Sequence, residues 1–222
     1  VPVLDLTTET HAYIGEEAVV VSQGNVLVTA KDHTETDMIG GAAAISGAGG
    51  FGASVVTTMI NKDTRAYVAP LADVSALGNS ETTILVFSGE ANSDGKYKND
   101  DDEFRQCDIS GLGVQAASSE DVFAIAVAGA AGSNGGVAGS VAVESINSDT
   151  TAHIGSLAII NQENSGAGED QSVYVTAVNQ ADVLAIAGSV AGGAVGLAGG
   201  VDVGVIRNDT YAGVGDGASV HA

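Results

Sequence analysis

The chain has 222 residues, of which 45% are hydrophobic, but it contains no Trp, only 4% aromatic residues and 31 glycines. Its apolar residues are mostly Ala, Val and Ile, which suit thin, tightly stacked strands and exclude a bulky aromatic core. The 28 acidic and 7 basic residues give a formal net charge of −21, which argues against binding to nucleic acid or anionic membranes.

A ten-residue motif begins at Leu6–Gly15 and returns at Ile60–Ala69, Ile146–Gly155 and Ile206–Gly215. It consists of an apolar residue, two variable residues, Asp or Glu, Thr, a variable residue, Ala, a variable residue, Ile or Val, and then Gly or Ala. Acidic side chains often bond nearby backbone amides at turns. The acid–Thr step therefore predicts a structural corner in each repeat, formed by Asp63, Thr64, Asp149, Thr150, Asp209 and Thr210.

Two further elements separate successive copies of this motif. A short strand with alternating apolar residues is expected at Val26–Ala30, Gly113–Ala116 and Val173–Ala177. An apolar run that begins with Asp follows at Asp37–Ile45, Asp121–Gly129 and Asp182–Val190. The order of the three elements is the same throughout the chain, so they form one repeating unit.

The equivalent residues Ile14, Val68, Ile154 and Val214 are separated by 54, 86 and 60 residues. A fixed order that tolerates insertions is typical of stacked repeats. Apolar residues alternate within each repeat, which indicates strands of about five residues with one buried face. The sequence therefore predicts an all-β fold, in which residues 1–222 form a single parallel β-solenoid with about three coils in each 54–60-residue repeat.

Three runs without charged residues, Met38–Ile60, Val122–Val143 and Val183–Val201, are long enough to be transmembrane candidates. They consist mostly of Gly, Ala and Ser, and they lack aromatic belts and flanking clusters of Lys or Arg. We expect no membrane insertion, and predict that each run forms buried, Gly-rich strands joined by a Gly turn.

An insertion at about 88–110 interrupts the repeats, with nine charged residues between Asp94 and Asp108. It is expected to leave the solenoid as a loop, and loops on rigid scaffolds often have functional roles. A calcium ion is one possible ligand, because acidic oxygens suit this ion, although the spacing does not match an EF-hand. A solvated acidic loop is the alternative; the candidate calcium ligands are Asp94, Asp100, Asp101, Asp102 and Glu103.

Other chemical motifs do not predict a site, and no further cofactor is expected. The histidines vary between repeats and show no convergence on a metal; they are His11, His33, His153 and His221. The glycines of Gly47–Gly52 lack a following Gly-Lys-Ser/Thr, as a phosphate loop requires. The single cysteine, Cys107, cannot form an internal disulfide and is either a structural residue or part of an intermolecular bridge.

Catalysis is not expected, because an acid repeated in every unit is structural by default, whereas an active site is unique. A carbohydrate-active β-helix with clustered carboxylates on one outer face remains the enzymatic alternative. An ice-binding solenoid would need flat Thr-x-Thr ladders on successive coils, and the threonines are not arranged in this way.

The segments Asp182–Gly188, Val195–Gly199 and Asn208–Thr210 resemble repeats of the large filamentous adhesins of Gram-negative bacteria. These are type V secreted, haemagglutinin-like and leukotoxin-like surface proteins, and the resemblance covers most of the chain outside about 88–110. It implies a right-handed parallel β-helix at the bacterial cell surface, with roles in adhesion or biofilm fibres and no catalytic residues. The chain starts inside a repeat and is expected to be an internal segment of a longer protein.

The resulting expectation is a structural or adhesive segment of an extracellular bacterial surface protein, with a host or cell-surface glycan or protein as partner. A self-assembling extracellular filament subunit is an alternative, because unpaired strand edges at the ends of the stack favour end-to-end association.

Overall fold

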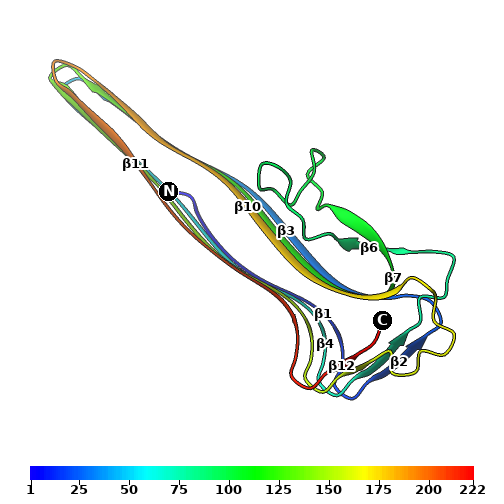
Figure 1. Cartoon of the computed structure of the whole chain (residues 1–222). Helices are drawn as coiled ribbons and strands as arrows, with labels where there is room; N and C mark the ends of the chain where they lie inside the picture. Colours follow the sequence, from blue (N-terminus) through cyan, green and yellow to red (C-terminus); the bar gives the residue numbers. More distant parts are fainter.

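The computed structural model describes residues 1–222, which form strands, turns and bends without any helix, and so without a helix that could span a membrane. The chain builds three parallel sheets in rotation (Figure 1). The first sheet contains β1 (Val3–Ile14), β4 (Gly49–Val68), β8 (Gly135–Ile154) and β11 (Gly196–Val214). The second sheet contains β2 (Val19–Ser22), β5 (Asp73–Ala76), β9 (Ile159–Ile160) and β12 (Ser219–Val220). The third sheet contains β3 (Val26–Ser46), β7 (Gln106–Gly132) and β10 (Gln171–Gly192).

Each repeat contributes one layer to these sheets. Ile14 pairs with Val68, Val68 with Ile154, and Ile154 with Val214, so hydrogen-bonded neighbours are a whole repeat apart. The all-β fold and the parallel sheets are confirmed, but the prediction of three coils in each repeat is wrong. The short strand and the Asp-led run, expected as separate elements, are one continuous strand, and β7 reaches 27 residues.

The corners of the chain lie just after the repeated motif rather than within it. In successive layers Glu17, Leu71, Leu157 and Gly217 adopt φ values of 57°, 61°, 60° and 71°. These left-handed residues form one column, and each turn is closed by a backbone hydrogen bond such as that from Ala18 N to the Gly15 carbonyl oxygen, 3.2 Å.

The predicted acid–Thr corners are therefore wrong. Asp63 and Thr64 lie inside β4, and the corresponding pairs lie inside β8 and β11. Strand alternation turns Thr64 into the interior, where it is fully buried, and leaves Asp63 on the outer face. The same alternation applies to Asp149, Thr150, Asp209 and Thr210.

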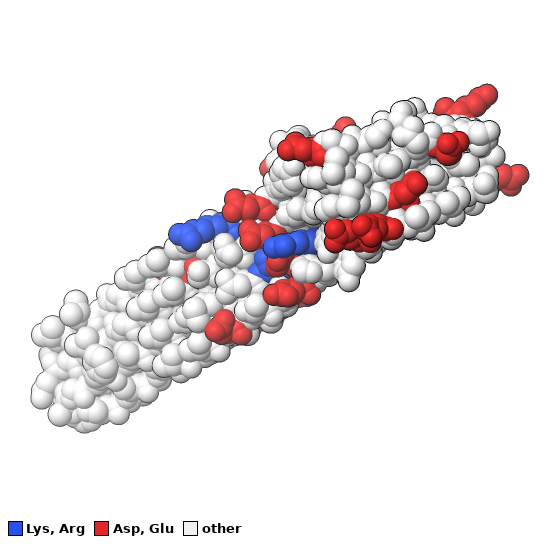
Figure 2. Space-filling view, turned by 90° about the horizontal axis from the view of Figure 1, so that it is seen from below, with Lys and Arg blue, Asp and Glu red and all other residues white.

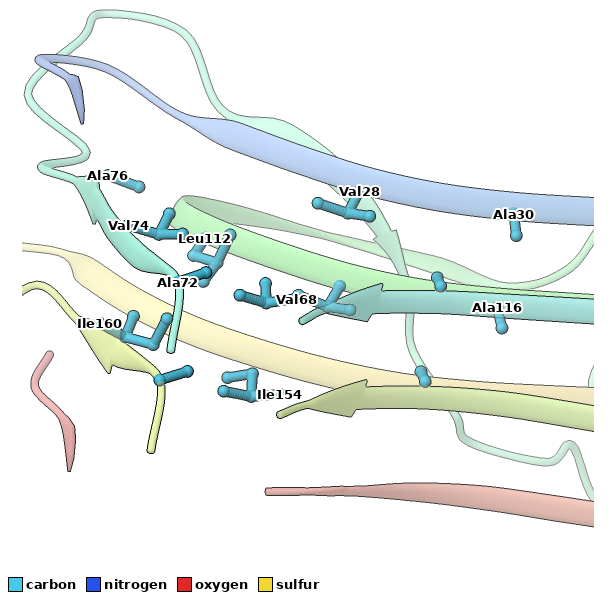
Figure 3. Close-up of a cluster of buried hydrophobic side chains, with 14 residues drawn as sticks. Val28, Ala30, Val68, Ala72, Val74, Ala76, Leu112, Ala116, Ile154 and Ile160 are labelled. Atoms are coloured by element: carbon cyan, nitrogen blue, oxygen red, sulfur yellow. The ribbon is translucent and has the colours of Figure 1, made fainter. Parts of the chain in front are cut away.

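The molecule is a wedge (Figure 1). The second sheet holds the other two apart at one end, which we call the body. Fourteen buried apolar residues from all three sheets fill it, and they include Val28, Val68, Val74, Leu112 and Ile154 (Figure 3). At the opposite end the first and third sheets converge to a thin tip. We call this end, residues 38–59, 122–143 and 183–201, the blade.

Small inward side chains allow the two sheets of the blade to lie close together. Ala126 and Ala130 point inward from β7 and are 0% and 6% exposed. A Cβ atom on Gly136 of β8 would lie 2.6 Å from the Ala130 carbonyl oxygen, so this position requires glycine. The three charge-free runs thus form strand–turn–strand units, as predicted. They are not buried on their outer faces, where Ile39 is 67% and Phe51 71% exposed.

The turns at the tip differ in length from layer to layer. Two residues, 47–48 and 133–134, join the strands in the first two tips, whereas three residues, 193–195, form the last one. Measured between paired positions, the last tip is one residue shorter: Ala131 and Gly136 are five positions apart, whereas their partners Gly192 and Gly196 are four apart, so the turn absorbs the missing residue.

Candidate functional site

The insertion lies against the outer face of the third sheet (Figure 1). It starts earlier than residue 88, because the residues added relative to the first layer lie between Ala76, which pairs with Ser22, and Leu112, which pairs with Val26. Its strand β6 (Ile84–Phe87) pairs antiparallel with the start of β7. The rings of Phe87 and Phe104 meet edge to face, with centroids 5.6 Å apart, and pack on Ala117 and Val178 of the sheet. The expectation that the insertion leaves the solenoid as a loop is wrong for this part, because apolar residues fix it to the scaffold.

Two glutamines of the sheet bond to the backbone of the insertion. Gln180 Oε1 accepts hydrogen bonds from the amides of Tyr97 and Lys98, at 3.0 and 3.2 Å. Gln115 Oε1 accepts one from the Phe87 amide at 2.7 Å. These bonds give buried backbone groups a partner, so the insertion has a defined position on the sheet.

The acidic run at Asp100–Glu103 forms the tip of a tight hairpin. The Asn99 side-chain oxygen accepts hydrogen bonds from the amides of Asp101 and Glu103, at 3.0 and 2.9 Å, and Asp102 Oδ1 accepts one from Lys98 Nζ, 3.0 Å. The structure does not bring these acids and Asp94 together as a ligand set: nowhere in the chain do three or more His, Cys, Asp or Glu side chains form a group able to hold a metal ion. The geometry therefore favours the solvated acidic hairpin over the calcium site.

Cys107 is half-buried where β6 pairs with β7, opposite Val86. The hydroxyl of Tyr174 donates a hydrogen bond to the Ser88 carbonyl oxygen, 2.8 Å. Burial and the neighbouring Cys107 thiol raise the pKa of Tyr174. Cys107 thus lies in the strand pair that attaches the insertion to the third sheet, and an intermolecular bridge remains a prediction.

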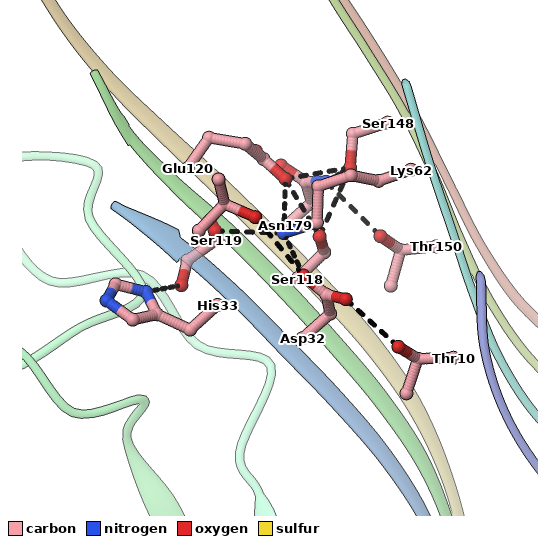
Figure 4. A network of polar contacts seen from close by, with 11 residues as sticks. Thr10, Asp32, His33, Lys62, Ser118, Ser119, Glu120, Ser148, Thr150 and Asn179 are labelled. Atoms are coloured by element: carbon pink, nitrogen blue, oxygen red, sulfur yellow. Dashed lines mark hydrogen bonds and ion pairs between the residues drawn. The ribbon is translucent and has the colours of Figure 1, made fainter. Parts of the chain in front are cut away.

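A polar network lies in the interior, across the third sheet from the insertion (Figure 4). Its centre is Lys62 on β4, whose side chain is 0% exposed. Lys62 Nζ lies 2.5 Å from Asp32 Oδ1 and 3.1 Å from Glu120 Oε1, and it donates to the Ser119 carbonyl oxygen at 3.0 Å. The three N–H donors of the ammonium group therefore have three acceptors.

Hydroxyl and amide groups extend this network between layers. Thr10 Oγ1 donates to Asp32 Oδ2 at 2.9 Å, Ser148 Oγ donates to Glu120 Oε1 at 3.0 Å, and Asn179 Nδ2 donates to Ser148 Oγ at 2.7 Å. Burial alone would raise the pKa of Asp32, but Lys62 and the Thr10 hydroxyl hold it below its usual value. Because these groups have little contact with solvent, the network joins the sheets rather than offering a ligand site.

Glu144 lies closer to the blade, on the inner face of β8, and is 1% exposed. Neither of its carboxyl oxygens has a hydrogen-bond partner. Burial and the nearby carboxyl group of Asp202 on β11 raise the pKa of Glu144 to about 7. Because β11 is the last strand of the first sheet, Asp202 remains exposed at the end of the stack.

The repeated acids form a column on the outer face of the first sheet, in the order Glu9, Asp63, Asp149 and Asp209. Like charges on neighbouring strands repel, and Arg65 Nε offsets this by bonding to Asp63 Oδ1 at 2.6 Å. A shallow hollow of about 150 Å³ runs along the column and is lined by Thr7, Thr8, Glu9, Asn61, Lys62, Asp63, Asn147 and Asp149.

An aromatic column lies on the same face, separated from the acids by the column of His11, Arg65 and Thr151. The rings of Tyr13, Tyr67 and His153 stack with centroids 5.1 and 5.2 Å apart and interplanar angles of 8° and 7°. Burial, with the neighbouring Arg65, lowers the pKa of His153. The other histidines do not join this column. His11 Nε2 is 3.8 Å from Asp63 Oδ2, and His33 Nδ1 bonds to Ser119 Oγ. His221 is near the C-terminus.

Comparisons with known proteins add no further assignment. No protein-family model, no curated protein sequence and no solved structure matches this chain.

Sequence reasoning missed the interior network, although alternation could have revealed it. Lys62 is two residues from Ile60, and Glu144 is two residues from Ile146, so each shares the inward face of a strand with a core residue. Charge at such a position indicates a buried polar group. The aromatic column had no comparable signal, because its position in the motif is variable.

Proposed function

We propose that this chain is a structural and adhesive segment of an extracellular bacterial surface protein or fibre, built as a right-handed parallel β-solenoid. The observation that supports it best is that each repeat forms one layer of the stack. The recurring Thr, Ala and Ile or Val residues of each repeat lie on their equivalents in the next layer. A continuous backbone ladder of this kind makes a stiff support that resists bending and presents its outer faces.

Two surfaces on this support suit adhesion. One is the acidic hairpin of the insertion, which the sheet holds in a fixed position. The other is the outer face of the first sheet in the body, which presents columns of asparagines and acids and, one column further on, the stacked aromatic rings. Evenly spaced hydrogen-bonding groups and stacked rings on one face match the hydroxyl groups and apolar faces of a polysaccharide, so a glycan is the partner we favour.

A glycan array probed with the intact chain tests this proposal. Two variants then locate the site: neutralisation of the hairpin by Asp100→Asn, Asp101→Asn and Glu103→Gln, and truncation of the sheet face by Asn61→Ala and Asn147→Ala. A matched control, with the same charge change as the hairpin variant, replaces Glu16, Glu163 and Glu169 with Gln. We expect one of the first two to lose binding and the control to retain it. Absence of any glycan binding would refute the glycan partner, and cleavage of a bound polysaccharide would favour the enzymatic alternative.

Assembly into a filament is a second candidate function, and the ends of the stack favour it. The inward-facing residues Ile206 and Val214 of β11 are 49% and 50% exposed, because no further layer covers them. The free edges of β11 and β1 are able to pair with another chain. Negative-stain microscopy of the purified chain would show long fibres if this occurs and single short wedges if it does not.

A further inference from the structure

The blade has its small side chains inside and its larger apolar side chains outside. On β8, Ala138 and Ala142 point inward, whereas Val137, Val141 and Val143 point outward. This is the reverse of the arrangement in a soluble protein with an ordinary core, where the larger apolar residues are buried. Wide apolar patches of this kind mark surfaces that another molecule covers.

Charge is divided between the two halves of the molecule. The three segments of the blade contain no charged residue, so the body and the insertion hold the whole net charge of −21. Figure 2 shows one face of the molecule, on which one end has no acidic or basic side chain. Two copies repel each other through their bodies, and only a contact between blades places no acid opposite another acid.

The outer face of the first sheet in the blade has a shallow trough of about 500 Å³. Its floor is the column of Ala53, Gly139 and Gly199, whose side chains are a methyl group or a hydrogen atom. The next column toward the body, Val55, Val141 and Val201, forms a ridge along one side. Thus a ridge and a trough lie next to each other.

We propose that two copies of this chain form a two-fold dimer through this face. An axis between the trough and the ridge, parallel to the direction of stacking, sets the ridge of each copy into the trough of the other. The same axis reverses the direction of the strands, so that the two blades overlap and the two acidic bodies lie at opposite ends. Shape and charge therefore select the same arrangement.

The area available suits a reversible dimer. From Phe51 to Met59 the face extends about 26 Å at 3.3 Å per residue, and three strands are about 14 Å wide. The footprint is about 400 Å² on each copy, or about 800 Å² in total, which is the range of weak and transient complexes. The pairing is lateral and closed, so it is distinct from the stacking of ends.

Sedimentation velocity of the intact chain over a wide concentration range tests the proposal. We expect a monomer–dimer equilibrium that shifts toward the dimer as NaCl is raised, because salt screens the repulsion between bodies. Val141→Glu places carboxylates at the centre of the contact and should weaken the dimer about 100-fold, since a charge buried without a partner is costly. Leu197→Glu should act in the same direction, and because this side chain is 66% exposed in the monomer the change should leave the fold intact.

Ile125→Glu on the outer face of the third sheet is the matched control and should leave the dimer intact. Circular dichroism confirms that each variant is folded. A wild-type chain that is monomeric at every concentration would overturn the proposal, and so would a dimer disrupted by Ile125→Glu but not by Val141→Glu. Open-ended oligomers that Val141→Glu and Leu197→Glu leave unchanged would also overturn it, as would a monomer that sediments with phosphatidylcholine vesicles. The last result would show that the blade binds lipid instead.

Discussion

Lys62 of β4 and Asp32 of β3 approach to 2.5 Å across the interior, although they belong to different sheets. Their contact lies between the large apolar core of the body and a small buried cluster of Ile60, Val122 and Ile146 on the blade side. It joins the first and third sheets at the level where polar groups interrupt the apolar interior.

Replacement of Lys62 by Met should lower the free energy of unfolding by about 3 kcal/mol, because Asp32 and Glu120 would keep buried carboxyl groups without a counter-charge. Urea unfolding measures the change. Lys96→Met is the control: Lys96 pairs with Asp182 at 3.1 Å, but its side chain is 55% exposed. That change should have little effect on the free energy of unfolding, because solvent screens an exposed ion pair. Equal losses in the two variants would contradict a central role for Lys62.

The stability of the fold should depend on Glu144 near neutral pH. Its pKa in the folded state, about 7, is above the ordinary value of 4.5, so the folded chain holds the proton more tightly than the unfolded chain does. The contribution of Glu144 is therefore complete below pH 4.5, declines as the pH rises to about 7, and levels off above it.

Glu144→Gln cannot ionise and should remove this decline, which amounts to at most about 3 kcal/mol. Above pH 7 the variant should be more stable than the wild type. Denaturant unfolding between pH 5 and 8 compares the two, with Glu35→Gln on an exposed position of β3 as the control. A wild-type slope that survives in Glu144→Gln would show that other groups cause it.

The close approach of the sheets in the blade can be tested at one glycine. Gly136→Ala adds a Cβ atom 2.6 Å from the Ala130 carbonyl oxygen and should destabilise the fold by about 1–3 kcal/mol. At Gly129, on the outer face of β7, the nearest atom to an added Cβ is 3.9 Å away. Gly129→Ala should be neutral in thermal unfolding, and a comparable loss there would mean that the sheets are not the cause.

The insertion should be able to unfold locally while the sheets of the body remain folded. Phe104 is 4% exposed, and Phe104→Ala should speed hydrogen exchange at the Tyr97 and Lys98 amides roughly 100-fold, while the Val114 amide in the body stays protected. Leu85→Ala, at a position 51% exposed, is the control and should leave all three rates unchanged. Faster exchange at Val114 would show that the insertion supports the body as well.

Calcium should not stabilise the chain, because the ion needs six to eight converging oxygens and the acids of the hairpin do not form a group able to hold a metal ion. We expect the same melting temperature with calcium and with a chelator. A rise in melting temperature that Asp100→Asn and Asp101→Asn abolish would restore the calcium site predicted from the sequence.

The repeat made the parallel stacking predictable, because matched motifs such as those at Glu9 and Asp63 must lie side by side if the layers stack. The number of layers was not predictable. Alternation continues without a break from Val26 to Ser46, and it shows which face a residue occupies but not how far a strand extends. The sequence also concealed the docking of the insertion, because the contact of Phe104 with Ala117 and Val178 joins residues that are distant along the chain.

Repeats of unequal length can stack in one register because the length changes fall in segments that do not pair with a neighbouring strand. The one-residue shortening at 193–195 falls between the last paired positions of β10 and the first of β11, and the long insertion lies before the parallel part of β7. Such a chain can gain or lose residues at its tips and at this junction over evolutionary time without changing the pairing of any layer. The same two places are suitable for grafting foreign peptides onto the scaffold.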